Sequence, residues 1–459
     1  MHIVSIEVER HPVLGSFLFS FDAGAGLKTF NLLIGSNGAG KTQIMDLVYD
    51  CIVKGFNPWN DEVHRKLTVI LTEAEITELG VTYSDLRFEY NGDRPNNWGA
   101  IKVFRVSDDV DVTRELLPKI QNNLVQKVFQ KSCRYSPVEI NFASKIIDSV
   151  KATTLDSDTV KTKSGPNLAE EIGQLLVDIY NQDAQEALLR ERTNAGKGVE
   201  YEIHEGKYDR FRKAYSRMFV GKTLSEVSPN DNKHNVLFRD ESNGTEFGIE
   251  GLSSGEKQVV YRVGYLLSNL GNIEGGVVFI DEPELSLHPV WQRKYLTFLK
   301  EVFASNGECK IQFIIASHSP YIIQGADFSE THIWQLKREK GTVTYDNVEK
   351  KWSVIPWGPT LGEITFQAFG LPTVEFHCDL YGALQSQKAP GEVKEIEKWF
   401  VGQGQTKEIS WNESGTGTPR TETLMTYVRN KIHHPDNTDR PDFSEKQLEE
   451  SILRMLTLI

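Results

Sequence analysis

Three short apolar runs supply the framework of this chain. Residues 30–34 and 310–316 are mostly apolar, and residues 277–280 are apolar and rich in β-branched types. Runs of this length without polar alternation predict strands that are buried on both faces, as in a parallel sheet. Residues 42–48 and 255–267 instead place apolar side chains at helical spacing. The pattern therefore predicts an α/β fold.

The rest of the chain divides into a long middle segment and a C-terminal region. In the middle segment we expect strands at 67–71, 86–90, 101–106 and 138–142 and then a helix at 168–192. After residue 330 we expect a strand at 331–336, a hairpin at 341–345, helices at 360–369, 374–385 and 422–434, and a last helix after the capping box of Ser444 and Gln447. Residues 403–420 are polar and predict a flexible link. The predicted domains are a core of residues 1–55 and 240–355, an insertion at 56–239, and a helical region at 360–459.

A glycine-rich loop joins the strand at 30–34 to the helix that follows it. The loop consists of Gly35, Ser36, Asn37, Gly38, Ala39, Gly40, Lys41 and Thr42. Its spacing matches G-x-x-x-x-G-K-[ST], in which backbone N–H groups and a helix N-terminus face a polyphosphate. Lys41 is expected to reach the β- and γ-phosphates, and Thr42 to ligate Mg²⁺. The loop therefore predicts ATP and Mg²⁺ as cofactors.

Polar side chains follow the other two buried strands at their carboxyl ends. Asp281 and Glu282 come directly after residues 277–280, and His318 follows residues 310–316. Open α/β sheets bind their ligands at this edge. We expect Asp281 to hold Mg²⁺, Glu282 to act as the general base on the attacking water, and His318 to contact the γ-phosphate. Glu284 is interpreted as a solvated residue at the start of a helix.

A further anion site is predicted near residue 253. The segment Gly251–Gln258 reads Gly-Leu-Ser-Ser-Gly-Glu-Lys-Gln and leads into the helix at 255–267. Ser253 and the N–H groups at the start of this helix suit a phosphate. Ser253, Gly255 and Glu256 are the nucleotide-contact residues expected here.

The order of these motifs resembles the ATP-binding-cassette (ABC) ATPase superfamily, over about residues 1–55 and 240–330. The resemblance makes 35–42 the Walker A loop, 252–256 the signature motif, 280–282 the Walker B end, 285–289 the D-loop and His318 the switch histidine. It implies an ABC-type P-loop ATPase head with a mixed sheet, a helical insertion and a mainly helical C-terminal region. Ser254 and Glu256 depart from the commonest signature, Leu-Ser-Gly-Gly-Gln. The Q-loop glutamine cannot be placed, because the candidates Gln121, Gln126 and Gln130 also fit a helix surface.

In the ABC family the signature helix faces the γ-phosphate that a partner protomer binds. ATP then joins two protomers, and its hydrolysis loosens them. The resemblance therefore implies a homodimer with two composite sites, or a higher oligomer.

Composition narrows the setting of the protein. No apolar run approaches the ~18 residues that a membrane span needs, and no signal peptide precedes the first strand. We therefore expect a cytoplasmic protein without membrane contact. The cysteines at 51, 133, 309 and 378 lack metal-site spacing and are expected to be reduced.

The net charge of −13 disfavours nonspecific coating of DNA. One basic stretch remains a candidate nucleic-acid patch. Its cations are Lys207, Arg210, Arg212, Lys213, Arg217 and Lys222, and its interleaved aromatics are Tyr208, Phe211 and Tyr215. The simpler interpretation is an amphipathic helix with buried aromatics and solvated cations.

Within the superfamily, residues 135–142, 360–364 and 429–437 resemble a bacterial anti-phage defence group. That group includes OLD-like ATPases and the PtuA-like ATPases of Septu systems, and it is related to RecF- and SMC-like ATPases. OLD proteins carry a Toprim nuclease, for which residues after 330 supply no carboxylate set. PtuA-like ATPases work with a separate HNH nuclease. The resemblance thus implies an HNH partner gated by ATP, with DNA near the complex.

Two alternatives stay open. The first is a DNA-repair ATPase of the RecF or SMC kind that binds duplex DNA directly. The second is a self-contained ribonuclease, because Arg429 and His434 fit the R-x₄-H pattern of HEPN ribonucleases. The structural interpretation of that pattern is a helix C-terminus, where His433 and His434 complement the helix dipole and Pro435 ends the helix.

Overall fold

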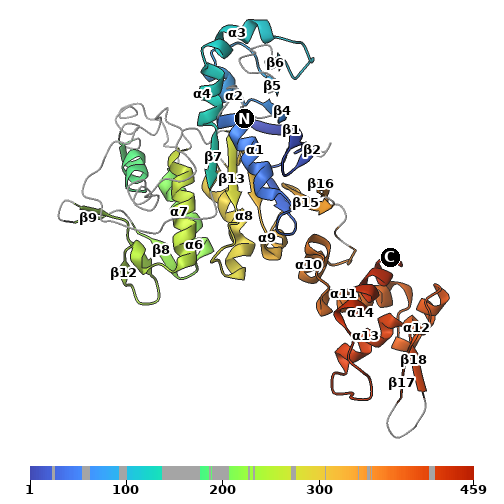
Figure 1. The fold of residues 1–459 in the computed structure, drawn as a ribbon. Coiled ribbons are helices and arrows are strands. Elements are labelled where there is room, and N and C mark those ends of the chain that lie inside the picture. Colours follow the sequence, from blue (N-terminus) through green and yellow to red (C-terminus); the bar gives the residue numbers. More distant parts are fainter. Residues whose placement is uncertain are drawn as a thin grey trace. The chain divides into compact units, whose positions relative to one another are not determined.

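The computed structural model of the chain contains two compact units, Met1–Asn347 and Val348–Ile459 (Figure 1). It describes residues 1–22, 26–53, 63–91, 101–136, 176–185, 188, 206–225, 228–230, 233–269, 275–304, 307–339, 341–348, 352, 354–412 and 419–459. The predicted strand at 138–142 and most of the predicted helix at 168–192 lie outside these residues. Each unit is built around its own hydrophobic core.

A six-stranded sheet forms the centre of the first unit, in the order β16-β15-β3-β14-β13-β7. Its strands are β16 (Thr342–Asn347), β15 (Thr331–Glu339), β3 (Phe30–Ile34), β14 (Ile311–Ala316), β13 (Gly276–Asp281) and β7 (Cys133–Ser136). All pairs are parallel except β15 with β16. Every residue of β3, β13 and β14 is buried. The three predicted core strands and the mixed sheet are confirmed.

A second, antiparallel sheet of five strands has the order β2-β1-β4-β5-β6. Its strands are β1 (His2–His11), β2 (Gly15–Ser20), β4 (His64–Ile70), β5 (Arg87–Asn91) and β6 (Ile101–Phe104). One core cluster contains Phe19 and Phe88 of this sheet together with Val277 and Ile314 of the central sheet. Residues 56–239 therefore contribute strands to both sheets of the head, and the domain division at residues 55 and 240 remains a prediction.

Helices connect the strands of the first unit. They are α1 (Lys41–Val53), α2 (Glu73–Glu78), α3 (Thr113–Gln121), α4 (Leu124–Lys131), α6 (Lys207–Met218), α7 (Ser254–Asn269), α8 (Pro289–Phe303) and α9 (Pro320–Gln324). Short strands β8 (Lys222–Leu224), β11 (Phe238–Asp240) and β12 (Glu246–Phe247) form a small sheet beside α6, and β9 (Ser228–Asn230) pairs with β10 (Lys233–Asn235).

The basic stretch at 207–222 is an amphipathic helix followed by a strand. Tyr208, Phe211 and Tyr215 are buried, and α6 packs against α8. The interpretation as an amphipathic helix with buried aromatics is therefore confirmed.

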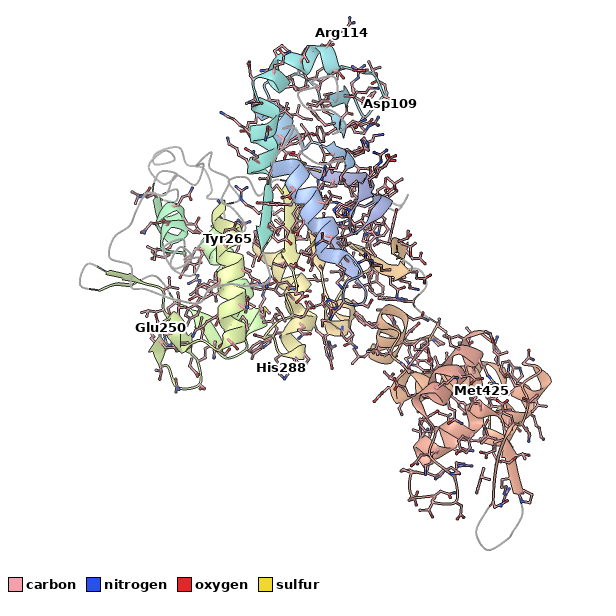
Figure 2. The ribbon with its side chains drawn as sticks, in the orientation of Figure 1. Asp109, Arg114, Glu250, Tyr265, His288 and Met425 are labelled. Carbon is pink, nitrogen blue, oxygen red and sulfur yellow. The ribbon has the colours of Figure 1, made fainter. Side chains whose placement is uncertain are left out.

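The second unit is mainly helical. It contains α10 (Leu361–Phe369), α11 (Val374–Lys388), α12 (Val393–Gly402), α13 (Leu424–His433) and α14 (Glu445–Leu456), plus a hairpin of β17 (Ile409–Asn412) and β18 (Pro419–Glu422). The predicted Ser444–Gln447 capping box is present. The core of the second unit includes Phe376, Leu380 and Met425, the last of which is labelled in Figure 2.

Two features of this unit differ from expectation. Helix α12 was not predicted, although Ile396 and Phe400 bury one of its faces. The prediction of a flexible link at 403–420 was wrong for residues 409–412 and 419–420, which form β17 and the start of β18. Only Trp411 of β17 is buried. A short, mostly exposed strand of this kind has few apolar residues, so its sequence resembles that of a loop.

Candidate active site

The glycine-rich loop leaves β3 and enters α1 through three glycines with positive φ. These are Gly35 at φ 139°, Gly38 at 77° and Gly40 at 101°. A Cβ at Gly35 would lie 2.3 Å from the carbonyl oxygen of Leu336, and one at Gly40 would lie 2.9 Å from Leu14 Cδ2. The loop needs glycine at 35 and 40 both for its backbone conformation and for its close packing. This geometry fits a phosphate-binding loop.

Lys41 folds back onto that loop. Its Nζ donates to the carbonyl oxygens of Gly35 and Ser36, at 2.9 and 3.2 Å, and the residue is buried. Burial lowers the pKa of Lys41 to about 8, while the carboxylates of Glu282 and Asp281 act in the opposite direction. The buried ammonium group of Lys41 is thus held by two backbone carbonyl oxygens. A bound anion would take the place of these carbonyl oxygens as its partner.

Thr42 and Asp281 bring two oxygen atoms together beside the loop. Thr42 Oγ1 donates to Asp281 Oδ1 at 3.3 Å, and Tyr135 Oη donates to Asp281 Oδ2 at 3.5 Å. Burial raises the pKa of Asp281, and the Thr42 hydrogen bond lowers it. A hydroxyl and a carboxylate next to a phosphate loop are the donors that Mg²⁺ prefers. The residues therefore fit the ion, which when bound would neutralise charge on the phosphates.

Glu282 and His318 lie at the same edge of the central sheet. Glu282 has a positive φ of 44°, and His318 Nε2 lies 3.7 Å from Glu282 Oε1. Burial and the nearby Lys41 lower the pKa of His318, while Glu282 acts to raise it. The imidazole is therefore biased towards its neutral form, which can accept or donate a proton. The Glu282 side chain is half-buried, and its backbone lies in the left-handed region that non-glycine residues rarely adopt.

Glu284 is not a solvated residue, so that interpretation was wrong. Its Oε1 accepts from the backbone N–H of His318 at 2.5 Å. Burial raises its pKa, and this hydrogen bond lowers it. Gln292 on α8 extends the network, because its Nε2 donates to Leu287 O at 2.7 Å and its Oε1 accepts from Ser319 Oγ at 2.5 Å. The loop after β13 and the loop after β14 are therefore joined by side chains.

The signature segment forms a capping box at the start of α7. Ser253 N and Ser253 Oγ donate to Glu256 Oε2 at 2.8 and 2.7 Å, and Glu256 N donates back to Ser253 Oγ at 3.4 Å. The Glu256 residue is 1% exposed. Figure 2 labels Glu250 in the turn before α7 and Tyr265 farther along the helix. Glu256 thus fixes the Ser253 side chain at the start of α7, and its predicted nucleotide contact stays a prediction.

Gly255 lies against the loop after β13. A Cβ at this position would lie 2.4 Å from Ser286 O and 3.2 Å from the ring of Trp291. Ser286 itself has a positive φ of 63°. Within the 285–289 segment, His288, labelled in Figure 2, caps α8, and its Nδ1 accepts from Val290 N at 3.3 Å. Glycine at 255 therefore permits contact between the signature and the predicted D-loop.

Arg262 is a site residue that sequence reasoning missed. It is 1% exposed on α7, and its Nη1 donates to Asp281 O at 2.9 Å. Its Nε donates to Gln258 Oε1 at 3.2 Å. The signal available in the sequence was a single cation within the apolar stretch 259–264. Because a buried cation needs partners, this arginine ties the signature helix to the end of β13.

The glutamines considered for a Q-loop lie elsewhere. Gln126 and Gln130 donate to the carbonyl oxygen of Val53 at 3.4 and 2.7 Å, at the end of α1. Gln121 is exposed at the end of α3. All three fit the interpretation as helix-surface residues.

The R-x₄-H pattern falls at the end of α13. Arg429 Nη1 donates to Asn430 Oδ1 at 3.0 Å, and its guanidinium lies 6.0 Å from the centre of the Tyr381 ring. His433 is the last residue of the helix, and His434 is its C-cap. Both histidines are exposed. This arrangement fits the helix C-terminus interpretation.

Comparison with known proteins gives one family and several partial relatives. The family described as "AAA domain, putative AbiEii toxin, Type IV TA system" matches residues 148–324. The Septu protein PtuA of Bacillus thuringiensis is 36% identical over 100 residues, which is 19% of this chain and 24% of PtuA. The "Retron Vc95 probable ATPase" of Vibrio cholerae serotype O1 biovar El Tor is 36% identical over 90 residues, which is 18% of this chain and 16% of the relative.

Among solved structures, an SMC head bound to the C-terminal winged-helix domain of ScpA has a TM-score of 0.41 and 14% identity. The match covers 76% of this chain and 99% of that one. The chain spans about a quarter or less of the length of the curated relatives it matches. Over these parts the sequence is similar to PtuA and to the retron ATPase. In the described parts of the chain, no helix is long and apolar enough to cross a membrane.

Proposed function

We propose that this chain is the ATP-hydrolysing subunit of a bacterial defence complex, in which ATP-dependent closure of a homodimer gates an HNH nuclease. The observation that carries the proposal is the Thr42–Asp281 hydrogen bond beside Glu282 and His318. It places a loop for phosphates, two oxygen donors for Mg²⁺ and a candidate general base at one edge of one sheet.

The side chains divide the work of hydrolysis. Lys41 exchanges its carbonyl partners for phosphate oxygens, and Thr42 and Asp281 hold Mg²⁺. Glu282 takes the proton of the attacking water. His318, fixed through its backbone by Glu284, contacts the γ-phosphate and responds to its loss.

Dimerisation follows from the signature segment. Ser253 forms its hydrogen bonds inside its own turn, next to an open pocket. In the proposed dimer the start of α7 meets the γ-phosphate bound by a second copy, and the copies are related by twofold symmetry. The contact of Gly255 with Ser286 connects that meeting point to the loop carrying Glu282.

The partner is inferred from similarity to PtuA. The described residues contain no cluster of three or more metal-ligating side chains. We infer that cleavage is performed by a separate HNH nuclease, with DNA near the complex. We infer that the second unit or the helical insertion supplies the docking surface; the second unit forms its own core and contributes no residue named for the ATP site.

Apolar faces of the helices at 360–369 and 374–385 were expected either to pack on the ATPase or to face a partner. The residues concerned are Phe366, Phe369, Phe376, Leu380 and Leu384. Phe366, Phe376, Leu380 and Leu384 are buried in the second unit's own core, and Phe369 is half-buried. We infer that a docking surface on this unit uses residues other than the four buried ones.

The test is a reconstitution with purified proteins. The chain alone should hydrolyse ATP and leave DNA uncut, and co-expression with an HNH nuclease encoded beside it should give a stable complex. ATP and Mg²⁺ should then change cleavage by the complex. Metal-dependent DNA cleavage by this chain alone, lost when carboxylates outside the ATP site are replaced, would overturn the partner model.

A further inference from the structure

The signature glutamate has an ion-pair partner in a segment far from it in sequence. Lys222 Nζ, at the start of β8, lies 2.6 Å from Glu256 Oε1. The other carboxylate oxygen, Oε2, accepts both donors of Ser253. The Glu256 side chain is 2% exposed and the Lys222 side chain 31%. A buried carboxylate is therefore bound on one oxygen by a lysine and on the other by the signature serine.

This pair borders a pocket that opens beside the start of α7. The pocket has a volume of about 370 Å³, and Ser253, Glu256 and Lys222 line it together with Trp291, Val290 and Lys294. Val220 and Val290 are exposed at 83% and 50%. A polar edge with exposed apolar side chains beside it fits a face that another protein surface covers.

A carboxylate at this position poses an electrostatic problem. The γ-phosphate of ATP is anionic, and Glu256 stands where the commonest signature has a neutral glutamine. A carboxylate without a compensating cation would repel a phosphate bound beside it. Lys222 cancels that charge, since the pair together is neutral.

We propose that Lys222 is a positioning residue for the composite ATP site. It neutralises Glu256, so that Ser253 and the start of α7 accept the γ-phosphate held by a second copy of the chain. The inference rests on the proposed homodimer. It also gives the segment between the two ATP motifs a role in ATP-dependent closure, because Lys222 belongs to that segment.

The proposal predicts a specific pattern of turnover among three variants, which a control variant of Lys294 accompanies. Lys222→Met should lower kcat at saturating ATP by at least about tenfold, because it strands a buried carboxylate at the closing face. Binding of a fluorescent ATP analogue to the unclosed chain should be unchanged, since Lys41 and Thr42 are untouched. Glu256→Gln supplies the neutral reference against which the double variant is compared. The double variant Lys222→Met/Glu256→Gln should match Glu256→Gln, because a neutral amide needs no lysine.

Lys294→Met is the matched control. Lys294 lines the same pocket, but its Nζ donates to the carbonyl oxygen of Arg217 at 3.2 Å and pairs with no carboxylate in the described residues. Its removal should leave turnover near that of the wild type. An equal loss in Lys294→Met would mean that general positive charge matters, and the pairing proposal would fail.

Other results also decide the question. Wild-type turnover in Lys222→Met, or a double variant as impaired as Lys222→Met alone, would overturn the assignment. If Lys222→Met does not fold, as judged by thermal unfolding, the folded double variant decides by its turnover relative to Glu256→Gln. Failure of the homodimer itself is distinguishable, because wild-type turnover per chain would then not depend on protein concentration.

Discussion

Thr42 Oγ1 donates to Asp281 Oδ1 across 3.3 Å, although 239 residues separate the two in sequence. Thr42 is the second residue of α1 and the last of the glycine-rich loop, and Asp281 ends β13. Strand β14 lies between β3 and β13, so both residues reach the same carboxyl edge of the sheet. This relationship joins the two halves of the proposed Mg²⁺–ATP site.

Two substitutions separate nucleotide binding from hydrolysis. Lys41→Ala should abolish ATP binding, because it removes the cation that the loop surrounds. Glu282→Gln should bind ATP but lose about 10²–10⁴ in turnover, the usual cost of a missing general base. It should also accumulate the closed dimer in sedimentation with ATP and Mg²⁺. Unchanged turnover in Glu282→Gln would remove Glu282 from its catalytic role.

Mixed dimers test whether the site is shared between protomers. Ser253→Arg should fold normally but block closure, because a bulky cation would occupy the space beside the start of α7. In a heterodimer of Lys41→Ala and Ser253→Arg chains, one composite site carries both substitutions and the other carries none. Partial recovery of turnover is expected on mixing, provided that one intact site suffices. Monomers under every nucleotide condition, by cross-linking and sedimentation, would exclude the shared site.

Gly255→Ala tests the contact between the signature and the predicted D-loop. Its Cβ would lie 2.4 Å from Ser286 O, so the loop must move, and turnover should fall by about 10²-fold, as small misplacements can cost. Gly382→Ala is the control, because Gly382 in α11 has nothing within 4 Å of an added Cβ. It should leave turnover unchanged and stabilise the second unit by about 1 kcal/mol in thermal unfolding. Full turnover in Gly255→Ala would show that the contact is dispensable.

The pKa of Lys41 predicts a pH dependence of nucleotide affinity. Burial lowers that pKa from 10.5 to about 8, so the ammonium loses its proton as the pH rises through about 8 in the free chain. A phosphate binds the protonated form, and the dissociation constant for ATP should therefore rise above this pH, by up to about tenfold per pH unit. Titration calorimetry between pH 7 and 9.5 measures this change.

Lys41→Arg supplies the comparison for that titration. A guanidinium stays protonated throughout this range, so any residual binding by Lys41→Arg should not depend on pH. A flat wild-type profile, or the same slope in both chains, would show that Lys41 is not the group that titrates.

Much of the site was predictable because its chemistry is local in sequence. The spacing of Gly35, Gly40 and Lys41 reflects a turn that only such residues form, and the structure gives both glycines positive φ. The strands before Asp281 and His318 were predictable for a similar reason. A strand buried on both faces has no polar alternation, so its pattern cannot be mistaken for a surface strand.

Other contacts could not be predicted, because they depend on which distant segments the fold brings together. In the sequence, Glu284 follows an acidic strand end, and such a position resembles the start of a helix. The partner of its carboxylate is the backbone N–H of His318, which the neighbouring loop after β14 supplies. The sequence likewise did not indicate a partner for the Arg262 guanidinium. That partner, the carbonyl oxygen of Asp281, comes within reach only when α7 packs beside the central sheet. Burial of a side chain depends on the tertiary structure. The local sequence pattern predicts which face of a helix or strand is buried, but not the burial of a single polar side chain.

The sequence by itself determined the glycine-rich loop, the acidic strand end, the position of His318 after a buried strand and the α/β class, because each depends on residues adjacent in the chain. Only the tertiary structure decided that residues 64–136 add strands to both sheets of the first unit, and that Lys222 pairs with Glu256. Strand pairing and ion pairing between distant segments depend on three-dimensional proximity. That proximity arises from the packing of the whole core, which no single stretch of sequence specifies.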